Sequence, residues 1–339
     1  MPEINAFFDL LISTVPQTIS IIGLAKNVGK TTTLNYLIER ASFNANIKIG
    51  ISSTGWDGET YDSITGKPKP KIILHKGTIA ATTEECLTRS SSDYRTIEKT
   101  NLPTSLGNVV IIEVLDTGRF EIAGPVTISE LDEIKKKLIL LGANLILFDG
   151  AINRKASSSK LISDRIIIAS GMNAGYNTNE VKINTNLILS VYSLPVLPIQ
   201  LEIVADYGKI YVKCNTEFIK LDRESDLNSL FSDDMHLPSL IYIPGAFTDK
   251  TAEKIITLKK KIDILIDDPS SFFLTPQIWG KLNKQKKKIF LREKAEIACI
   301  TLNPVSSSGY AVKSDSFLET MRDICKNFNT WDVVSGLGL

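Results

Sequence analysis

Short apolar runs alternate with amphipathic segments along most of this chain. Runs of Ile, Val and Leu bounded by turn residues are typical of strands that are buried on both faces. One segment with helical spacing runs from Leu131 to Leu141, and Thr127 and Glu130 stand at capping-box positions ahead of it. The pattern predicts strands at 18–22, 47–51, 72–74, 109–115, 145–148, 166–169, 240–243, 262–266, 289–291 and 297–302, and further helices at 34–41, 252–259, 276–282 and 317–325. We therefore expect an α/β fold with a mostly parallel sheet and helices on both of its faces.

The pattern changes near residue 195. Two short apolar runs, 201–204 and 210–212, flank a turn at Asp206 to Lys209, which predicts a small β-hairpin. We expect a nucleotide-binding core over 1–195, a β-rich insert over 196–238 and an α/β C-terminal region over 239–339. Because strands and helices still alternate in that last region, it can continue the sheet of the core.

Composition narrows the functional classes. The 339 residues carry 39 Lys and Arg against 38 Asp and Glu, so the net charge is +1. This balance argues against a nucleic-acid-coating protein. The four cysteines lack zinc-site spacing, and we expect each to be a small buried hydrophobe in a reduced, cytoplasmic protein. No apolar run approaches the ~20 residues that a membrane helix needs.

One motif points to chemistry. The strand 18–22 leads into Gly23, and after five more residues Gly29-Lys30-Thr31 opens a helix. Glycine lets the backbone approach phosphate oxygens, and the new helix directs its unpaired N–H groups at the same anion. Lys30 can reach the β- and γ-phosphates, and the Thr31 hydroxyl can bind Mg²⁺. The residues expected to bind the nucleotide here are Gly23, Lys26, Asn27, Val28, Gly29, Lys30, Thr31 and Thr32.

Two acidic positions complete the expected site. Asp149 ends the run 145–148, which suits a carboxylate that binds Mg²⁺ directly or through water. Asp57 and Glu59 follow the run 47–51, near Gly55 and Gly58, where an acidic group could bind Mg²⁺ or orient the attacking water in a loop that changes with nucleotide state. The alternatives are a helix cap or turn for Asp149 and a plain Asp/Gly turn for Asp57.

Asn303 is the expected base-recognition residue. It ends the run 297–302 and precedes Pro304, so an Asn-Pro turn is the competing interpretation. A G-protein N-K-x-D string is absent, which favours ATP over GTP. His75 and His236 show no partner and are expected to be structural, whereas the lysine-rich run 284–288 is expected to be a solvated surface.

The loop resembles that of a known class. The spacing G-x₅-G-K-T is one residue longer than the common G-x₄-G-K-[ST] and resembles the loop of the dethiobiotin synthetase family, within the dethiobiotin synthetase/MinD-like class of P-loop NTPases. Asp149-Gly150-Ala151 resembles that family's E-G-A turn. The signature lysine of MinD-like proteins would fall at Ala25, and Lys26 is one position away, so its role is not transferred.

A narrower resemblance covers most of the chain. The strings 23–33, 54–59, 67–70 and 149–151, together with Asn303-Pro304, resemble the P-loop reactivase subunit associated with lysine 5,6-aminomutase. Membership would imply an Mg²⁺- and ATP-dependent chaperone that releases damaged cobalamin from the aminomutase and works with a second reactivase protein. It would make the chain an ATPase, with Lys30 and Asp57 in catalytic roles, and leaves a homo-oligomer open.

Two other functions fit the same motif. A ligase or kinase of the dethiobiotin synthetase type would phosphorylate a bound carboxylate or carbamate, with cations such as Lys69, Lys71 or Arg154 at its substrate pocket. A nucleotide-binding sensor would bind without appreciable turnover. Hydrolysis rates with and without partners or metabolites separate the three.

Overall fold

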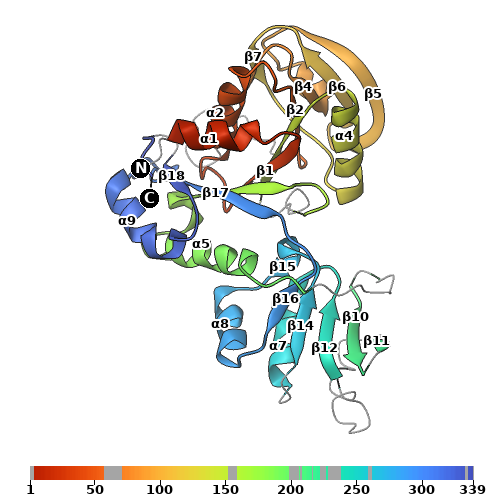
Figure 1. Ribbon diagram of the computed structural model, residues 1–339, viewed down its shortest axis with the longest axis vertical. Helices are drawn as coiled ribbons and strands as arrows, with labels where there is room; N and C mark the ends of the chain where they lie inside the picture. The colour runs from red at the N-terminus through yellow and green to blue at the C-terminus, as the bar shows by residue number, and fades with distance from the viewer. Residues whose placement is uncertain are drawn as a thin grey trace. The chain divides into compact units, whose positions relative to one another are not determined.

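The structure is a computed structural model that describes residues 4–56, 71–151, 159–197, 206, 208–215, 217–221, 227, 238–258, 262–332 and 335–338. The chain divides into two compact units (Figure 1). Unit 1 is made of Met1–Thr185 and Ala295–Leu339, and unit 2 of Asn186–Lys294.

Unit 1 is built on a large sheet. In the described part of the chain it has nine strands in the order β18 (Thr330–Asp332), β17 (Glu296–Asn303), β9 (Arg165–Gly171), β1 (Gln17–Gly23), β8 (Leu145–Ala151), β2 (Ile49–Ser53), β4 (Ile79–Thr83), β6 (Gly107–Val114) and β5 (Tyr94–Thr104). Each neighbouring pair from β18 to β4 is parallel, whereas β6 runs antiparallel to both β4 and β5. The α/β prediction is confirmed, but the sheet is mixed, so the prediction of a mostly parallel sheet is not confirmed for the whole of it.

Helices pack on both faces of this sheet, because successive apolar residues of its central strands point to opposite faces. Leu145 and Leu147 of β8 join a core with α1 (Ile4–Ser13) and α2 (Lys30–Ser42). Ile146 and Phe148 point the other way, into a core with α4 (Ile128–Leu140). Figure 1 shows α1 and α2 together and α4 across the sheet from them. The predicted capping box of Thr127 and Glu130 is present at the start of α4.

Unit 1 also contains several smaller elements and two further helices. They are α3 (Glu84–Leu87), the antiparallel pair β3 (Ile72–Leu74) and β7 (Gly118–Phe120), the 3₁₀ helix η2 (Met172–Ala174), α5 (Thr178–Tyr192) and α9 (Ser314–Cys325). The boundary between the two units falls within α5.

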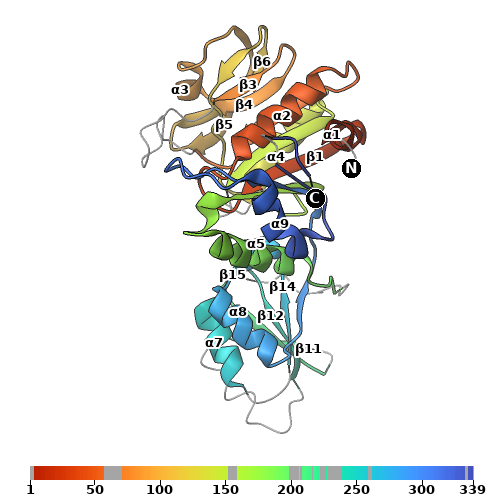
Figure 2. The same ribbon diagram turned by 90° about the vertical axis from the view of Figure 1, so that its left-hand side faces the viewer.

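Unit 2 has its own sheet. Within the described residues its order is β11 (Glu217–Leu221), β10 (Ile210–Cys214), β12 (Pro238–Ile243), β14 (Asp263–Ile266) and β16 (Ile289–Leu291). β12, β14 and β16 are parallel, and β10 is antiparallel to its neighbours. The helices α7 (Asp249–Thr257) and α8 (Pro276–Lys284) pack on one face and lie side by side in Figures 1 and 2. A short parallel pair joins β13 (Phe247–Thr248) to β15 (Phe272–Phe273) next to η3 (Pro269–Ser271).

The structure divides the chain differently from the three expected segments 1–195, 196–238 and 239–339. β17 and β18 return to the sheet of unit 1, so part of the last segment does continue that sheet. The strands β10, β11, β12, β14 and β16 instead form one separate sheet, which joins the expected insert to the region after it. Of the expected hairpin, 201–204 lies outside the described residues, and β10 pairs with β11 around Asn215.

The cysteines follow the expectation. Cys86, Cys214, Cys299 and Cys325 are free and buried. Burial raises the pKa of the Cys325 thiol to about 11. Among the described helices, none has the length and apolar character to cross a membrane.

Candidate functional site

The candidate site begins where β1 ends. All seven residues of β1 are buried, and its last residue is Gly23. A Cβ atom added at Gly23 would lie 2.6 Å from Cγ and Cδ of Lys30. The lysine side chain therefore passes directly over this glycine, which explains why a residue without a side chain stands there.

The helix α2 opens without a side-chain cap. Its N-cap is Gly29, which has φ 94° and ψ 11°, in the left-handed region that favours glycine. The first main-chain bond of the helix runs from the Thr33 N–H to the Gly29 carbonyl at 3.0 Å. The N–H groups before Thr33 have no acceptor inside the helix, so this end is suited to an anion.

Lys30 and Asp149 meet at this helix end. Lys30 Nζ lies 3.4 Å from Asp149 Oδ1, and their side chains are 15% and 18% exposed. Asp149 is brought there by β8, which pairs with β1 so that Asp149 stands opposite Ile21. The contact is an ion pair without hydrogen-bond geometry. Asp149 Oδ1 is buried and accepts no hydrogen bond from the described residues.

The main chain around Asp149 is held by the end of β2. The Thr54 N–H and the Ser53 hydroxyl donate to the Asp149 carbonyl at 2.9 and 3.1 Å. β2 thus ends beside the ion pair, as expected for the strand that precedes Asp57. Asp57 itself lies outside the described residues.

Sequence reasoning missed the contact that follows β2. The Trp56 indole N–H donates to Glu121 at 2.8 Å, and the Arg89 guanidinium lies 5.8 Å from the Trp56 ring centre and also pairs with Glu121. No local signal in the sequence links these three residues, which lie far apart along the chain.

Asn303 is at the site, at the end of β17. Its Nδ2 donates to the Asn27 carbonyl at 3.2 Å, and its Oδ1 accepts from the Val305 N–H at 3.0 Å. Asn173 donates to the same Asn27 carbonyl at 3.1 Å. Asn173 was not predicted; it lies in η2, two residues after the end of the neighbouring strand β9, whereas Asn303 is the last residue of β17.

The remaining predicted residues line the same loop. Val28 is buried, and its Cγ2 lies 3.0 Å from the position that a Cβ atom at Gly23 would take. Lys26 is exposed. Thr31 and Thr32 lie half-buried in the first turn of α2. The Thr31 hydroxyl has no hydrogen-bond partner among the residues described. The loop therefore brings Gly23 and 26–32 together with Asp149 and Asn303.

Among the described residues, Asp149 supplies the carboxylate that lies beside Lys30. Within the described parts of the chain, no group of three or more His, Cys, Asp or Glu residues could hold a metal ion. Mg²⁺ commonly binds proteins through one or two carboxylates and takes its other ligands from phosphates and water. Asp149, with a buried oxygen that accepts no hydrogen bond from the described residues, and the Thr31 hydroxyl fit that mode of binding.

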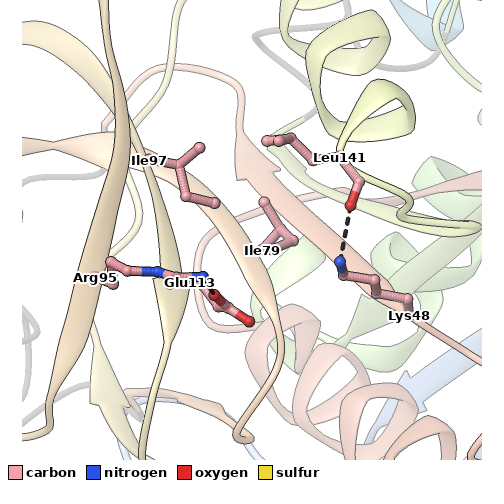
Figure 3. A pocket seen from close by; sticks show the side chains of 6 residues that line it. All are labelled: Lys48, Ile79, Arg95, Ile97, Glu113 and Leu141. Atoms are coloured by element: carbon pink, nitrogen blue, oxygen red, sulfur yellow. Dashed lines mark hydrogen bonds and ion pairs between the residues drawn. The ribbon is translucent and has the colours of Figure 1, made fainter.

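A separate open pocket of about 380 Å³ lies elsewhere in unit 1. Figure 3 shows its six lining residues, Lys48, Ile79, Arg95, Ile97, Glu113 and Leu141. Lys48 directly precedes β2 and Ile79 begins β4, so the pocket is at the amino edge of these parallel strands. Ligands of open α/β sheets bind at the carboxyl edge, where Gly23 and Ser53 lie, so we assign the chemistry to that edge instead.

The weaker candidates are not gathered at the site. His75 lies in a turn, where its carbonyl accepts from the Thr78 N–H, and His236 is outside the described residues. Within the lysine-rich run 284–288, the structure departs from a fully solvated surface. Lys287 is buried, donates to the Leu258 carbonyl at 3.3 Å, and burial lowers its pKa.

Comparison of the chain with family models, with curated proteins and with solved structures gave no match.

Proposed function

We propose that unit 1 binds a nucleoside triphosphate with Mg²⁺ and hydrolyses it. The carrying observation is the lysine–aspartate pair at an uncapped helix end. Lys30 stands at the first position of α2, 3.4 Å from an aspartate oxygen that accepts no hydrogen bond from the described residues. An ion pair built only for stability would be expected to satisfy that oxygen.

The two charges would separate when the substrate binds. Lys30 Nζ would move from Asp149 to the phosphate oxygens, where its charge offsets the negative charge that develops during transfer. Asp149 Oδ1 would then bind the metal, together with the Thr31 hydroxyl. When bound there, Mg²⁺ would supply positive charge that stabilises the negative charge developing on the phosphate groups. The first N–H groups of α2 and its left-handed Gly29 would hold the phosphate chain in place.

The cycle needs an attacking water, and Asp57 remains the residue proposed to orient it. The loop that carries Asp57 follows β2 directly, and β2 ends with its main chain bonded to Asp149. A change of nucleotide state at Asp149 would thus shift the main chain at Thr54, where this segment begins.

For the role in the cell, we propose a reactivating chaperone, on the basis of the motif resemblance described for the strings 23–33, 54–59, 67–70 and 149–151. Hydrolysis would then drive a change in a protein partner, an aminomutase together with a second reactivase protein. The ligase and the sensor remain the alternatives. Stimulation of turnover by the partner supports the chaperone, metabolite-dependent ATP consumption supports the ligase, and binding without turnover supports the sensor.

Binding of Mg²⁺·ATP by the purified chain tests the nucleotide proposal. Calorimetry on the unaltered protein should show one site per chain that disappears when Mg²⁺ is chelated. Asp149→Asn removes the charge but keeps the shape, so it should abolish the dependence on Mg²⁺ while leaving metal-free binding. Equal Mg²⁺ dependence in the variant and the unaltered protein would remove Asp149 from the site.

A further inference from the structure

Two asparagine side chains, one from a 3₁₀ helix and one from a strand, converge on one main-chain oxygen of the loop before α2. Asn173, in η2 after β9, and Asn303, the last residue of β17, donate to the Asn27 carbonyl at 3.1 and 3.2 Å. A carbonyl oxygen has two lone pairs, so it can accept both bonds. The bonds join residues separated by 146 and 276 positions in the chain.

Each of the two amides is itself oriented by a second contact. Asn173 Oδ1 accepts from both the N–H and the hydroxyl of Ser307, at 3.0 and 3.2 Å. Asn303 Oδ1 accepts from the Val305 N–H at 3.0 Å. With their oxygens held in this way, the NH₂ groups are directed at Asn27 before any ligand arrives.

The two bonds fix the direction of one peptide unit. The Asn27–Val28 bond is trans, so its carbonyl and its N–H point in opposite directions. Holding the carbonyl towards the asparagines turns the Val28 N–H away from them. Within the described residues this N–H has no acceptor. Asn27 has φ 59°, in the left-handed region that asparagine adopts more readily than most non-glycine residues.

We propose that Asn173 and Asn303 are positioning residues that hold the Val28 N–H ready for a phosphate oxygen. The inference rests on the proposed nucleotide binding and deepens it. It also changes the role expected for Asn303, because both polar atoms of its side chain have partners within the loop region. Asn303 is therefore proposed to position the main chain that contacts phosphate, and not to contact the base.

The first test compares a ligand that has a base with one that has none. Calorimetry with Mg²⁺ and either inorganic triphosphate or ATP should show Asn173→Ala and Asn303→Ala each weakening both ligands about fivefold, since one hydrogen bond is lost. Loss of both bonds should weaken both ligands about 25-fold if they act independently. Asn303→Ala that weakens ATP but not triphosphate would show base recognition and overturn the inference, as would unchanged affinity for both ligands.

Two further variants separate positioning from folding. Asn173→Asp keeps the acceptor for Ser307 but replaces the donor with a carboxylate oxygen that repels the Asn27 carbonyl, so it should weaken triphosphate more than Asn173→Ala. Ser307→Ala removes only the hydroxyl contact and leaves the Ser307 N–H, so its effect should be less than twofold. Equal affinities for Asn173→Asp and the unaltered protein would count against the proposal.

The second test needs no ligand. Hydrogen exchange of the segment 24–29 in the nucleotide-free protein should be faster in both alanine variants, while exchange in α4 should be unchanged. If the unaltered protein binds neither triphosphate nor ATP, the proposed function fails. The exchange result still decides whether the asparagines hold the loop, and unchanged exchange would overturn that.

Discussion

The two units each place a cation beside an aspartate near the ends of parallel strands, but they satisfy it differently. In unit 2, Asp267 directly follows β14 and accepts from the Tyr242 hydroxyl at 2.7 Å, from Arg292 at 3.0 Å and from the Gly245 N–H at 3.1 Å. In unit 1, Asp149 has Lys30 at 3.4 Å and an oxygen without a hydrogen bond from the described residues. Both carboxylate oxygens of Asp267 accept hydrogen bonds within the fold, whereas Asp149 Oδ1 is left able to bind a ligand.

The N-termini of α7, α8 and α2 differ in the same way, in whether their polar groups have partners within the fold. In unit 2, the Thr248 and Thr275 side chains cap α7 and α8. In unit 1, α2 opens at Gly29 with no side-chain cap. A capped helix end has satisfied part of its own N–H groups, and an uncapped one leaves them for an anion. The contrast teaches that burial and charge pairing alone do not mark a site, and that unsatisfied groups are the better guide.

Removing the lysine should give the largest effect. Lys30→Ala deletes the charge proposed to stabilise the transferring phosphate, so ATP turnover should fall about 100-fold or more. Steady-state phosphate release measures it. The matched control is Lys250→Ala, which removes a lysine from the first turn of the capped helix α7 and should leave turnover unchanged. Full turnover in Lys30→Ala would contradict the assignment of this loop.

Exchanging each aspartate for asparagine should separate stability from activity. Asp267→Asn weakens charge-assisted bonds in a closed network, so unit 2 should lose about 2 kcal/mol. Asp149→Asn breaks a pair without hydrogen-bond geometry at an oxygen that accepts no hydrogen bond from the described residues, so unit 1 should lose less stability than unit 2 while turnover collapses. Hydrogen exchange resolves the two units, and phosphate release reports activity. The comparison breaks if Asp149→Asn destabilises more than Asp267→Asn.

Much of unit 1 could be predicted because its signals are local. The strand–glycine–lysine order before α2 and the capping box of α4 are read within a few residues, and both elements are present. The nucleotide chemistry assigned to them stays a prediction. β5 was not predicted, because its residues are mostly exposed and lack an apolar alternation.

Long-range contacts account for what the sequence could not reveal. β17 pairs with β9 although more than a hundred residues separate them, and this pairing carries Asn303 to Asn27. Asn173 has no motif around it, and its role depends on that same strand order. The division into units was likewise decided by pairing, since β17 and β18 rejoin the first sheet.

An alanine at the left-handed glycine should have an intermediate effect. Gly29 has φ 94°, and Gly208 in unit 2 has φ 78°, so alanine at either should cost about 1–2 kcal/mol of backbone strain. A Cβ atom at Gly29 would lie 3.4 Å from Asn303, and one at Gly208 meets nothing within 4 Å. Both variants should lose similar stability by thermal unfolding, but only Gly29→Ala should weaken triphosphate binding. Weakened binding in Gly208→Ala would show that strain alone explains the loss.

The smallest effect concerns a helix cap of unit 2. Thr248→Ala removes the hydroxyl that accepts from the Thr251 N–H at 3.5 Å, a long bond, so the loss of stability should be about 0.5–1 kcal/mol. Thr248→Ser keeps the hydroxyl and should restore most of it. Hydrogen exchange in α7 measures both variants, and ATP turnover should be the same in each. Even without this cap, α7 lacks the left-handed glycine and the lysine–aspartate pair found at the start of α2, and it carries Asp249 in its first turn, so adding triphosphate should not slow exchange there in Thr248→Ala. Protection of the uncapped α7 by triphosphate would mean that any open helix end in this protein binds the anion, and that the glycine, lysine and aspartate of unit 1 confer no selectivity.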